Sequence, residues 1–151
     1  MADMPVNIEA EYAVIGTLLL GVPGDWDRAR AVVGPEDFYR ASFALIFQAM
    51  DSVAMSGEPP DAVTVYERLT SSGRIEDAGG RAGIFGLLDS PLSGQNVEAW
   101  AKIVRDKADR RRVIEDAELA TKAALDPTVA PQSIPPVRPD AQGYLEDLPP
   151  R

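Results

Sequence analysis

The stretch Asn96–Leu125, NVEAWAKIVRDKADRRRVIEDAELATKAAL, decides the fold of this chain. Its first half repeats apolar residues at helical spacing, which predicts an amphipathic helix docked on a core. Its second half places small and apolar residues on nearly the opposite side of the same helix, and the charged run 109–112 marks the changeover. The two stripes are Val97, Trp100, Ala101, Val104 and Ala108, and then Val113, Ala117, Ala120 and Ala124.

This change of face indicates two different packing partners. The first half is expected to close a globular head, and the second half to leave the head and offer a narrow stripe to another helix. No second helix of that kind is evident later in the chain, because segment 126–151 is rich in proline, which removes amide donors and breaks helices. A docking surface without a partner in its own chain indicates assembly with another protein.

Composition narrows the possible functions. A chain of 151 residues with 45% hydrophobic residues is long enough for one domain with its own core. It contains neither cysteine nor histidine. Disulfides, Ser-His-Asp and Cys-His catalysis, and the usual zinc and non-haem iron sites are therefore excluded. No signal peptide or membrane-spanning run is evident, so a soluble, cytoplasmic protein without metal or cofactor is expected.

The formal net charge of −9 opposes nonspecific binding to nucleic acid. One local exception is a basic cluster in the middle of the long helix. It has two interpretations: a solvated face whose cations pair with neighbouring carboxylates, or a contact for a partner. The basic cluster comprises Arg105, Lys107, Arg110, Arg111 and Arg112, and its candidate ion-pair partners are Asp106, Asp109, Glu115 and Asp116.

Apolar periodicity upstream predicts about five shorter helices and no sheet. Asn7 is the expected N-cap of the first helix, Asp61 that of the fourth and Asn96 that of the long helix. In the fourth helix, Val63, Tyr66 and Leu69 are expected to face inward. Glycines or Gly-Pro pairs end the helices. The expected helices run from Asn7 to Leu20, over Trp26–Val33, from Phe43 to just before Gly57, from Asp61 to Gly73, and after Gly79-Gly80.

Two patterns resemble catalytic or ligand sites only superficially. The carboxylate groups Glu9 with Glu11, Glu36 with Asp37, and 115–118 have no nearby histidine or lysine and are expected to be solvated at the surface. The segment Gly79–Gly83 lacks the strand, the longer glycine frame and the Lys-Ser or Lys-Thr pair of a P-loop. It is expected to be a flexible helix entry.

Taken together, several passages resemble the N-terminal domain of the DnaB-type replicative DNA helicases. Their order and spacing carry the resemblance, over roughly residues 5 to 120. Tyr12 and Phe43 stand where glutamine and histidine are more usual, and one extra residue is present between Pro91 and Asn96. The matching passages are 7–16, 37–40, 46–50, 57–64, Gly73, Gly79-Gly80, Asn96, 103–108 and 111–114.

The resemblance implies a helical domain whose last long helix begins a hairpin that pairs with a neighbour's hairpin. Such domains form a collar on a hexameric ring and receive the DnaG-type primase, and the motor domain lies further along the family's chain. Neither a motor nor a second hairpin helix is evident here. The resemblance implies no catalytic, cofactor or metal residue in this chain.

The sequence therefore predicts an all-α fold of about five short helices plus one long one, followed by a Pro-rich tail. Expected boundaries are a flexible arm (1–6), a head (7–108), a projecting helix (109–125) and an extended or disordered tail (126–151). The predicted function is a noncatalytic assembly module of replication that self-associates or binds replicative helicase and primase. A stand-alone adaptor or inhibitor, and a fragment of an ATP-dependent helicase, are the alternatives. The expected contact residues are Arg105, Arg110, Arg111, Arg112, Val113, Ala117, Ala120 and Ala124.

Overall fold

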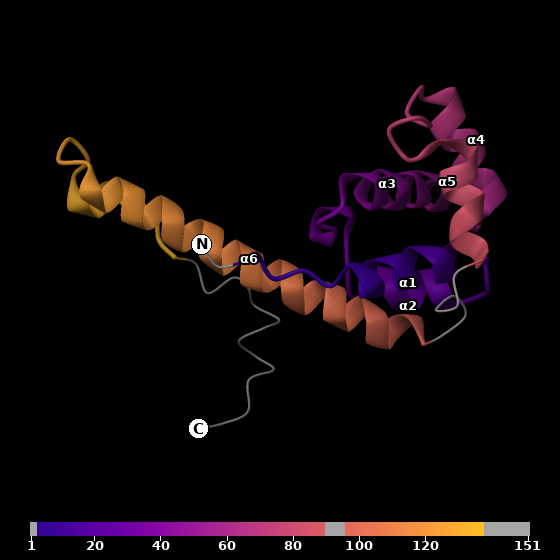
Figure 1. Cartoon of the computed structure of the whole chain (residues 1–151), viewed down its shortest axis with the longest axis horizontal. Coiled ribbons are helices and arrows are strands. Elements are labelled where there is room, and N and C mark those ends of the chain that lie inside the picture. The colour runs from indigo at the N-terminus through magenta and orange to yellow at the C-terminus, as the bar shows by residue number, and fades with distance from the viewer. Residues whose placement is uncertain (1–2, 90–95, 138–151) are drawn as a thin grey trace. The chain divides into compact units, whose positions relative to one another are not determined.

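The computed structural model describes residues 3–89 and 96–137, and within these ranges the chain is helical without a β-strand. Its backbone forms two compact units, Val6–Arg105 and Met1–Pro5 with Asp106–Arg151. The predicted all-α class is confirmed (Figure 1). The elements are α1 (Ile8–Leu19), α2 (Asp25–Arg30), η1 (Pro35–Asp37), α3 (Ala41–Met55), α4 (Ala62–Ser71), α5 (Gly80–Gly86), η2 (Leu87–Asp89), α6 (Val97–Leu125) and η3 (Pro131–Ser133), where η denotes a 3-10 helix.

Helix α1 is the centre of the first unit and packs against α2, α3 and η2. The side-chain oxygen of Asn7 accepts a hydrogen bond from the Ala10 amide at 2.9 Å, which confirms the predicted N-cap. Gly21, with a φ of +72°, follows the C-cap in the left-handed conformation that glycine adopts without strain. Both ends of α1 are therefore set by the residues that the sequence analysis identified.

The core of the first unit is built around Phe47 of α3, which is fully buried. Its ring centroid lies 5.0 Å from that of Trp26 and 5.1 Å from that of Phe38, within the range of favourable aromatic contacts. Residues from α1 to α6 contribute to the same cluster. Helix α3, which carries Phe47, packs against α1 and α4.

Helix α4 begins at the predicted cap but faces the core differently from the prediction. The Asp61 carboxylate accepts from the Thr64 amide at 2.8 Å, and the Thr64 hydroxyl accepts from the Asp61 amide at 2.9 Å. Val63 was expected to face inward, but its side chain is 62% exposed, and Val65 is buried instead. The prediction for Val63 is wrong because Ala62, Val65 and Leu69 form the buried stripe.

The segment between α2 and α3 also differs from the prediction. Helix α2 ends at Arg30 rather than Val33, and Val32 and Val33 continue it as a turn whose amides both bond to the Ala29 carbonyl. The following 3-10 helix η1 was expected to be a simple connection. It is closed by Asp37, whose carboxylate accepts from the Gly34 amide at 2.7 Å.

Helix α6 is continuous over 29 residues, as the sequence predicts. The Asn96 side chain accepts from the Ala99 amide at 3.3 Å, in agreement with its predicted capping role. Val97, Ala101 and Val104 are buried in the core of the first unit. Residues from Asp106 onward belong to the second unit.

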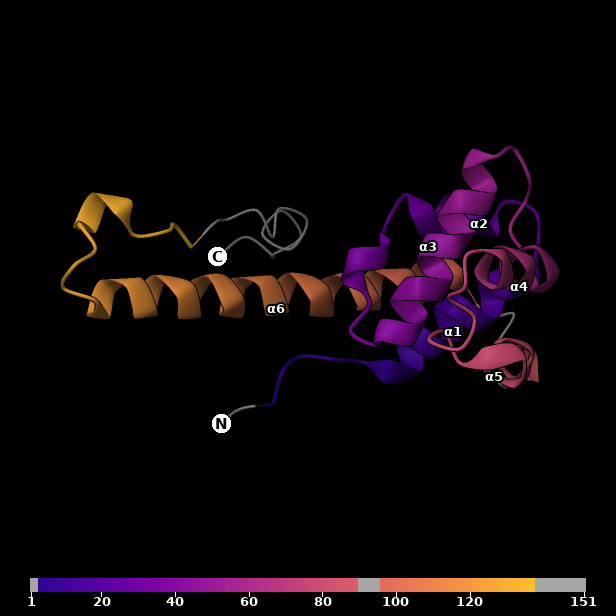
Figure 2. The same ribbon diagram turned by 90° about the horizontal axis from the view of Figure 1, so that it is seen from above.

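The second unit continues past α6 into a reversed segment that the sequence did not predict. Asp126 accepts from both the amide and the hydroxyl of Thr128, and η3 follows. Figure 2 shows the chain turning back after α6. Of the predicted tail 126–151, residues 138–151 lie outside the described part of the chain.

No helix in the described ranges is both long enough and apolar enough to cross a membrane.

Candidate functional site

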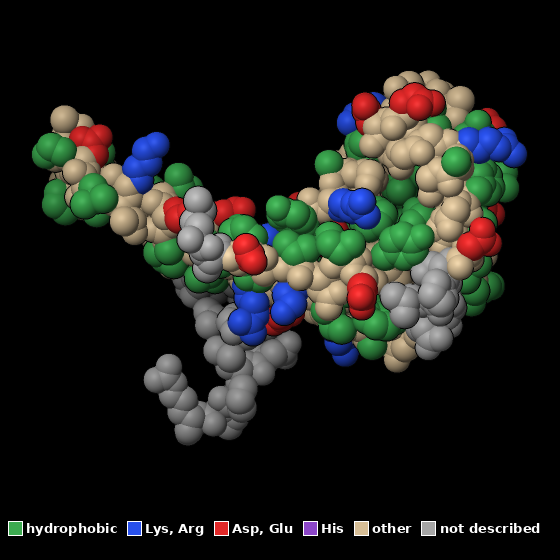
Figure 3. All heavy atoms as spheres, in the orientation of Figure 1, with side chains coloured by type: hydrophobic (Ala, Val, Ile, Leu, Met, Phe, Trp, Pro, Cys, Tyr) green, Lys and Arg blue, Asp and Glu red, His purple; other side chains and the backbone are tan. Residues whose placement is uncertain are grey.

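The part of α6 beyond Arg112 carries the apolar residues that the sequence assigned to a partner. Val113, Ala117 and Ala120 are partly buried, and Ala124 is exposed. Their spacing of four, three and four residues places them on one face of the helix. Two larger residues nearby, Leu119 and Leu125, are 57% and 79% exposed. Figure 3 shows hydrophobic side chains gathered at the C-terminal end of α6.

A shallow apolar groove of about 490 Å³ follows this part of α6. Its lining residues recur at helical spacing, but they lie roughly a quarter of a turn from the centre of the predicted stripe. Only Ala117 belongs to both. The sequence analysis missed the groove because polar residues interrupt it, although the spacing of Ile114, Thr121 and Leu125 was available as a signal. The groove is lined by Ile114, Ala117, Glu118, Thr121, Lys122 and Leu125, and we call this set the α6 groove.

Two arginines of the basic cluster form ion pairs within α6. Arg110 lies 3.0 Å from the Asp106 carboxylate, and Arg112 lies 2.9 Å from that of Asp109. The Arg110 pair is exposed and matches the interpretation of a solvated helix face. The Arg112 pair does not, because Asp109 is only 1% exposed. An exposed pair contributes little to stability, so the fold does not depend strongly on the pairing of Arg110 with Asp106.

Arg105 and Arg111 bond to the backbone, which the sequence analysis did not predict. In the first unit, the Arg105 guanidinium donates to the Val32 carbonyl at 3.3 Å. In the second, Arg111 is buried and donates to the Pro5 carbonyl at 2.8 Å. No sequence signal identified this contact, because its partner is a backbone atom 106 positions away. The N-terminal arm, of which residues 3–6 are described, is therefore hydrogen-bonded to α6 through Pro5, whereas the sequence predicted a flexible arm.

Two of the carboxylates expected at the surface are buried. Glu11 and Asp37 are each 1% exposed, so the prediction of solvation is wrong for both. The Glu11 carboxylate accepts from the amides of Tyr39 and Arg40 at 3.1 and 3.2 Å, immediately before α3. Asp37 closes η1 in a similar way. Both carboxylates hold backbone amides that have no partner within a helix, which is a structural role.

The glycine segment before α5 has the geometry of a helix entry. Gly79 and Gly80 have φ angles of +108° and +70°, and the Gly83 amide bonds to the Gly79 carbonyl at 3.1 Å. Its predicted role as a helix entry is confirmed. Across residues 3–89 and 96–137, no group of three or more acidic side chains has an arrangement that could hold a metal ion.

Asp126 follows the last residue of α6 and accepts hydrogen bonds from Thr128. Hydrogen bonds from the Thr128 hydroxyl and then the Thr128 amide hold the pKa of this carboxyl below its ordinary value of 3.8. The turn that reverses the chain is therefore formed with Asp126 ionised at neutral pH.

Comparisons with known proteins identify relatives that match most of this chain. The family model described as "DnaB-like helicase N terminal domain" matches residues 3–106. The replicative DNA helicase DnaB of Geobacillus stearothermophilus is 43% identical over 113 residues, covering 75% of this chain and 25% of the relative. The replicative DNA helicase DnaC of Bacillus subtilis is 40% identical over 113 residues, with the same coverage. The chain thus spans about a quarter of these relatives.

A similar fold is present in the crystal structure of the N-terminal domain of DnaB helicase from Mycobacterium tuberculosis. The TM-score is 0.80 at 26% sequence identity, and the match covers 97% of this chain and 100% of that one.

Proposed function

This chain belongs to the family of DnaB-like helicase N-terminal domains, and from that membership we propose that it is an assembly module of DNA replication. In this proposal the chain performs no catalysis itself. Its first unit is a folded platform, and the second half of α6 provides the contact for a helix of a second copy. A DnaG-type primase is the further proposed partner, by analogy with the family.

The observation that carries this proposal is the α6 groove, together with the predicted stripe beside it. Ile114 and Leu125 give it an apolar lining, and Leu125 is largely exposed. Alanine along the stripe allows another helix to approach closely but contributes little buried area per residue. The larger groove residues supply the apolar area that the alanines lack. Lys122 and Glu118 add charges at the rim of the groove.

The proposal is tested by placing a charge in the contact. We expect Ala117→Asp or Ala120→Asp to weaken self-association at least about tenfold, since an unpaired carboxylate would be buried against an apolar surface. Sedimentation velocity over a range of concentrations measures this. The thermal unfolding midpoint of the first unit should remain unchanged.

Leu119→Asp is the matched control because it adds the same charge on a different side of α6. It should leave self-association within about twofold of the parent, a small change in free energy. A parent chain that remains monomeric, and that captures neither a replicative helicase nor a primase, would overturn the proposal.

A stand-alone adaptor or inhibitor is a second candidate, favoured by the segment after α6. Residues 126–137 form a turn and η3 instead of a second long helix. An adaptor of this kind would occupy the collar position of a helicase and limit ring assembly. Mixing the chain with a replicative helicase and measuring ring mass separates the two candidates, because an assembly module joins rings and an inhibitor reduces their number.

A third possibility is that the chain is part of a longer ATP-dependent helicase, since the curated relatives are about four times as long as the matched region. DNA unwinding would then reside outside residues 1–151. Sequencing the gene beyond the codon for Arg151 tests this directly.

A further inference from the structure

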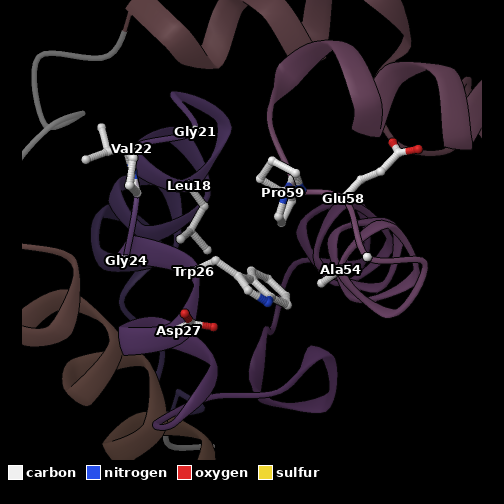
Figure 4. Close-up of a pocket in the computed structure, with 12 residues that line it drawn as sticks. Leu18, Gly21, Val22, Gly24, Trp26, Asp27, Ala54, Glu58 and Pro59 are labelled. Atoms are coloured by element: carbon white, nitrogen blue, oxygen red, sulfur yellow. The ribbon is translucent and has the colours of Figure 1, made fainter.

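A hollow of about 580 Å³ lies in the first unit and shares no lining residue with the α6 groove. It is bounded by the C-terminal end of α1, the start of α2, and the connection from α3 to α4. Figure 4 shows the Trp26 indole between Leu18 on one side and Ala54 and Pro59 on the other. Its walls therefore come from three separate parts of the chain that the core holds together.

The apolar floor of the hollow is fixed in position. Leu18 and Pro60 are buried, and Trp26 packs against Phe47 with ring centroids 5.0 Å apart. Pro59 and Pro60 restrict the backbone on the opposite wall. A preformed surface of this kind binds an extended peptide without first having to order itself, which lowers the entropic cost of binding.

The rim of the hollow carries negative charge that is not neutralised. Asp27 and Glu58 line it, both are exposed, and neither carboxylate has a hydrogen-bond or ion-pair partner within residues 3–89 and 96–137. The nearby Asp25, by contrast, is paired with Arg28 at 2.7 Å. Helices α1 and α3 both end at the hollow, and a helix C-terminus adds partial negative charge.

We propose that this hollow binds an extended segment of a partner protein that presents an arginine beside a proline or leucine. The apolar residue would rest on Leu18 and the prolines, and the guanidinium would lie over the Trp26 face beside Asp27, while Glu58 on the opposite wall adds negative charge to the rim (Figure 4). Arginine suits this arrangement because its planar cation stacks on aromatic rings and pairs with carboxylates. Acidic peptides and nucleic-acid phosphates would be repelled. The inference does not depend on the proposed assembly function.

The test is an NMR titration of the ¹⁵N-labelled full chain with the peptide acetyl-Gly-Leu-Pro-Arg-Pro-Gly-amide. We expect saturable shifts of the Trp26 indole N–H signal and of the Gly24 and Gly57 amides. The indole of Trp100, which does not line the hollow, is the internal reference. The same peptide with citrulline in place of arginine keeps the shape without the charge. It should bind about tenfold more weakly, because it loses the ion pair with Asp27, the attraction of Glu58 and the cation–π contact with Trp26.

Variants of the protein test the rim directly. Asp27→Asn with Glu58→Gln should weaken binding of the arginine peptide about tenfold. Glu67→Gln with Asp77→Asn is the matched control, since it removes two exposed charges elsewhere in the first unit and should change binding less than about twofold. None of these four carboxylates has a hydrogen-bond or ion-pair partner among the described residues, so both double variants should fold like the parent.

Three results would overturn the inference. The first is an absence of shifts at Trp26 up to millimolar peptide. The second is equal binding of the citrulline and arginine peptides by the unmodified protein, a comparison that does not depend on any variant folding. The third is equal or tighter binding of a peptide with glutamate in place of arginine.

Discussion

Glu11 is a carboxylate at a buried position of α1 that an apolar side chain could also occupy. It lies one turn before Ile15, between the fully buried Ala10 and the half-buried Tyr12, and is itself 1% exposed. Its two oxygens accept from the Tyr39 and Arg40 amides at 3.1 and 3.2 Å. In effect a side chain of α1 caps the start of α3, because Arg40 at the N-cap position provides no side-chain cap of its own.

We predict that Glu11→Ala lowers the free energy of unfolding by about 2 kcal/mol, because it leaves two amides beside the core without their charged acceptor. Glu11→Gln retains one acceptor oxygen and should lose less. Urea denaturation monitored by circular dichroism measures both. Glu9→Ala is the control, since Glu9 is exposed on the same helix and should cost less than about 1 kcal/mol. Equal losses for Glu9 and Glu11 would contradict the capping role.

At the scale of whole elements, caps and helix-ending glycines could be predicted because they act over three or four residues. Asn7, Asp61 and Asn96 all accept the expected amide bonds. The face of α4 could not be predicted in the same way. Val63 and Val65 are chemically alike, and only the packing of α4 against α3 and α5 makes Val65 the buried one.

The contact surface on α6 was likewise predictable only where it depends on local periodicity. The apolar stripe through Ala117 follows from periodicity, whereas the groove is interrupted by Glu118 and Lys122, whose aliphatic stems line it while their charges remain at the rim. Contacts between residues far apart in the chain could not be predicted from the sequence. Glu11 and Arg111 read as ordinary surface charges until their backbone partners, Tyr39 with Arg40 and Pro5, are placed beside them.

For the second unit, we predict that Arg111→Met releases the N-terminal arm. The buried guanidinium donates to the Pro5 carbonyl at 2.8 Å, and methionine keeps much of the side-chain volume but no donor. Heteronuclear ¹H–¹⁵N NOE values of residues 3–6 should fall, reporting faster motion of the arm on the ps–ns timescale. Arg110→Met removes the exposed ion pair with Asp106 and should leave these values unchanged. An arm that stays rigid in Arg111→Met would contradict this role.

At the scale of the whole molecule, two surfaces of different chemistry belong to different units. The hollow near Trp26 is apolar with an acidic rim and lies in the unit formed by residues 6–105. The α6 groove is apolar with mixed charge and lies in the unit that begins at Asp106. Because no lining residue is shared, substitutions in one should leave binding at the other unchanged. Additivity of this kind is expected for sites that share no partners.

The chain contains no cysteine, so single cysteines introduced on different faces of α6 can test which face pairs with a second copy. We predict that Ala117→Cys or Thr121→Cys, in the α6 groove, forms a disulfide-linked dimer under mild oxidation, whereas Leu119→Cys does not. Disulfides form only where the two Cα atoms come within about 7 Å, so cross-linking reports the face that meets its own copy across a two-fold axis. Non-reducing electrophoresis measures the yield. Residue 119 is a stringent control because Leu119 is 57% exposed. A cysteine there would form disulfides readily if cross-linking depended on random collision alone. Preferential cross-linking through residue 119 would place the contact on the other side of α6 and contradict the assignment of the groove.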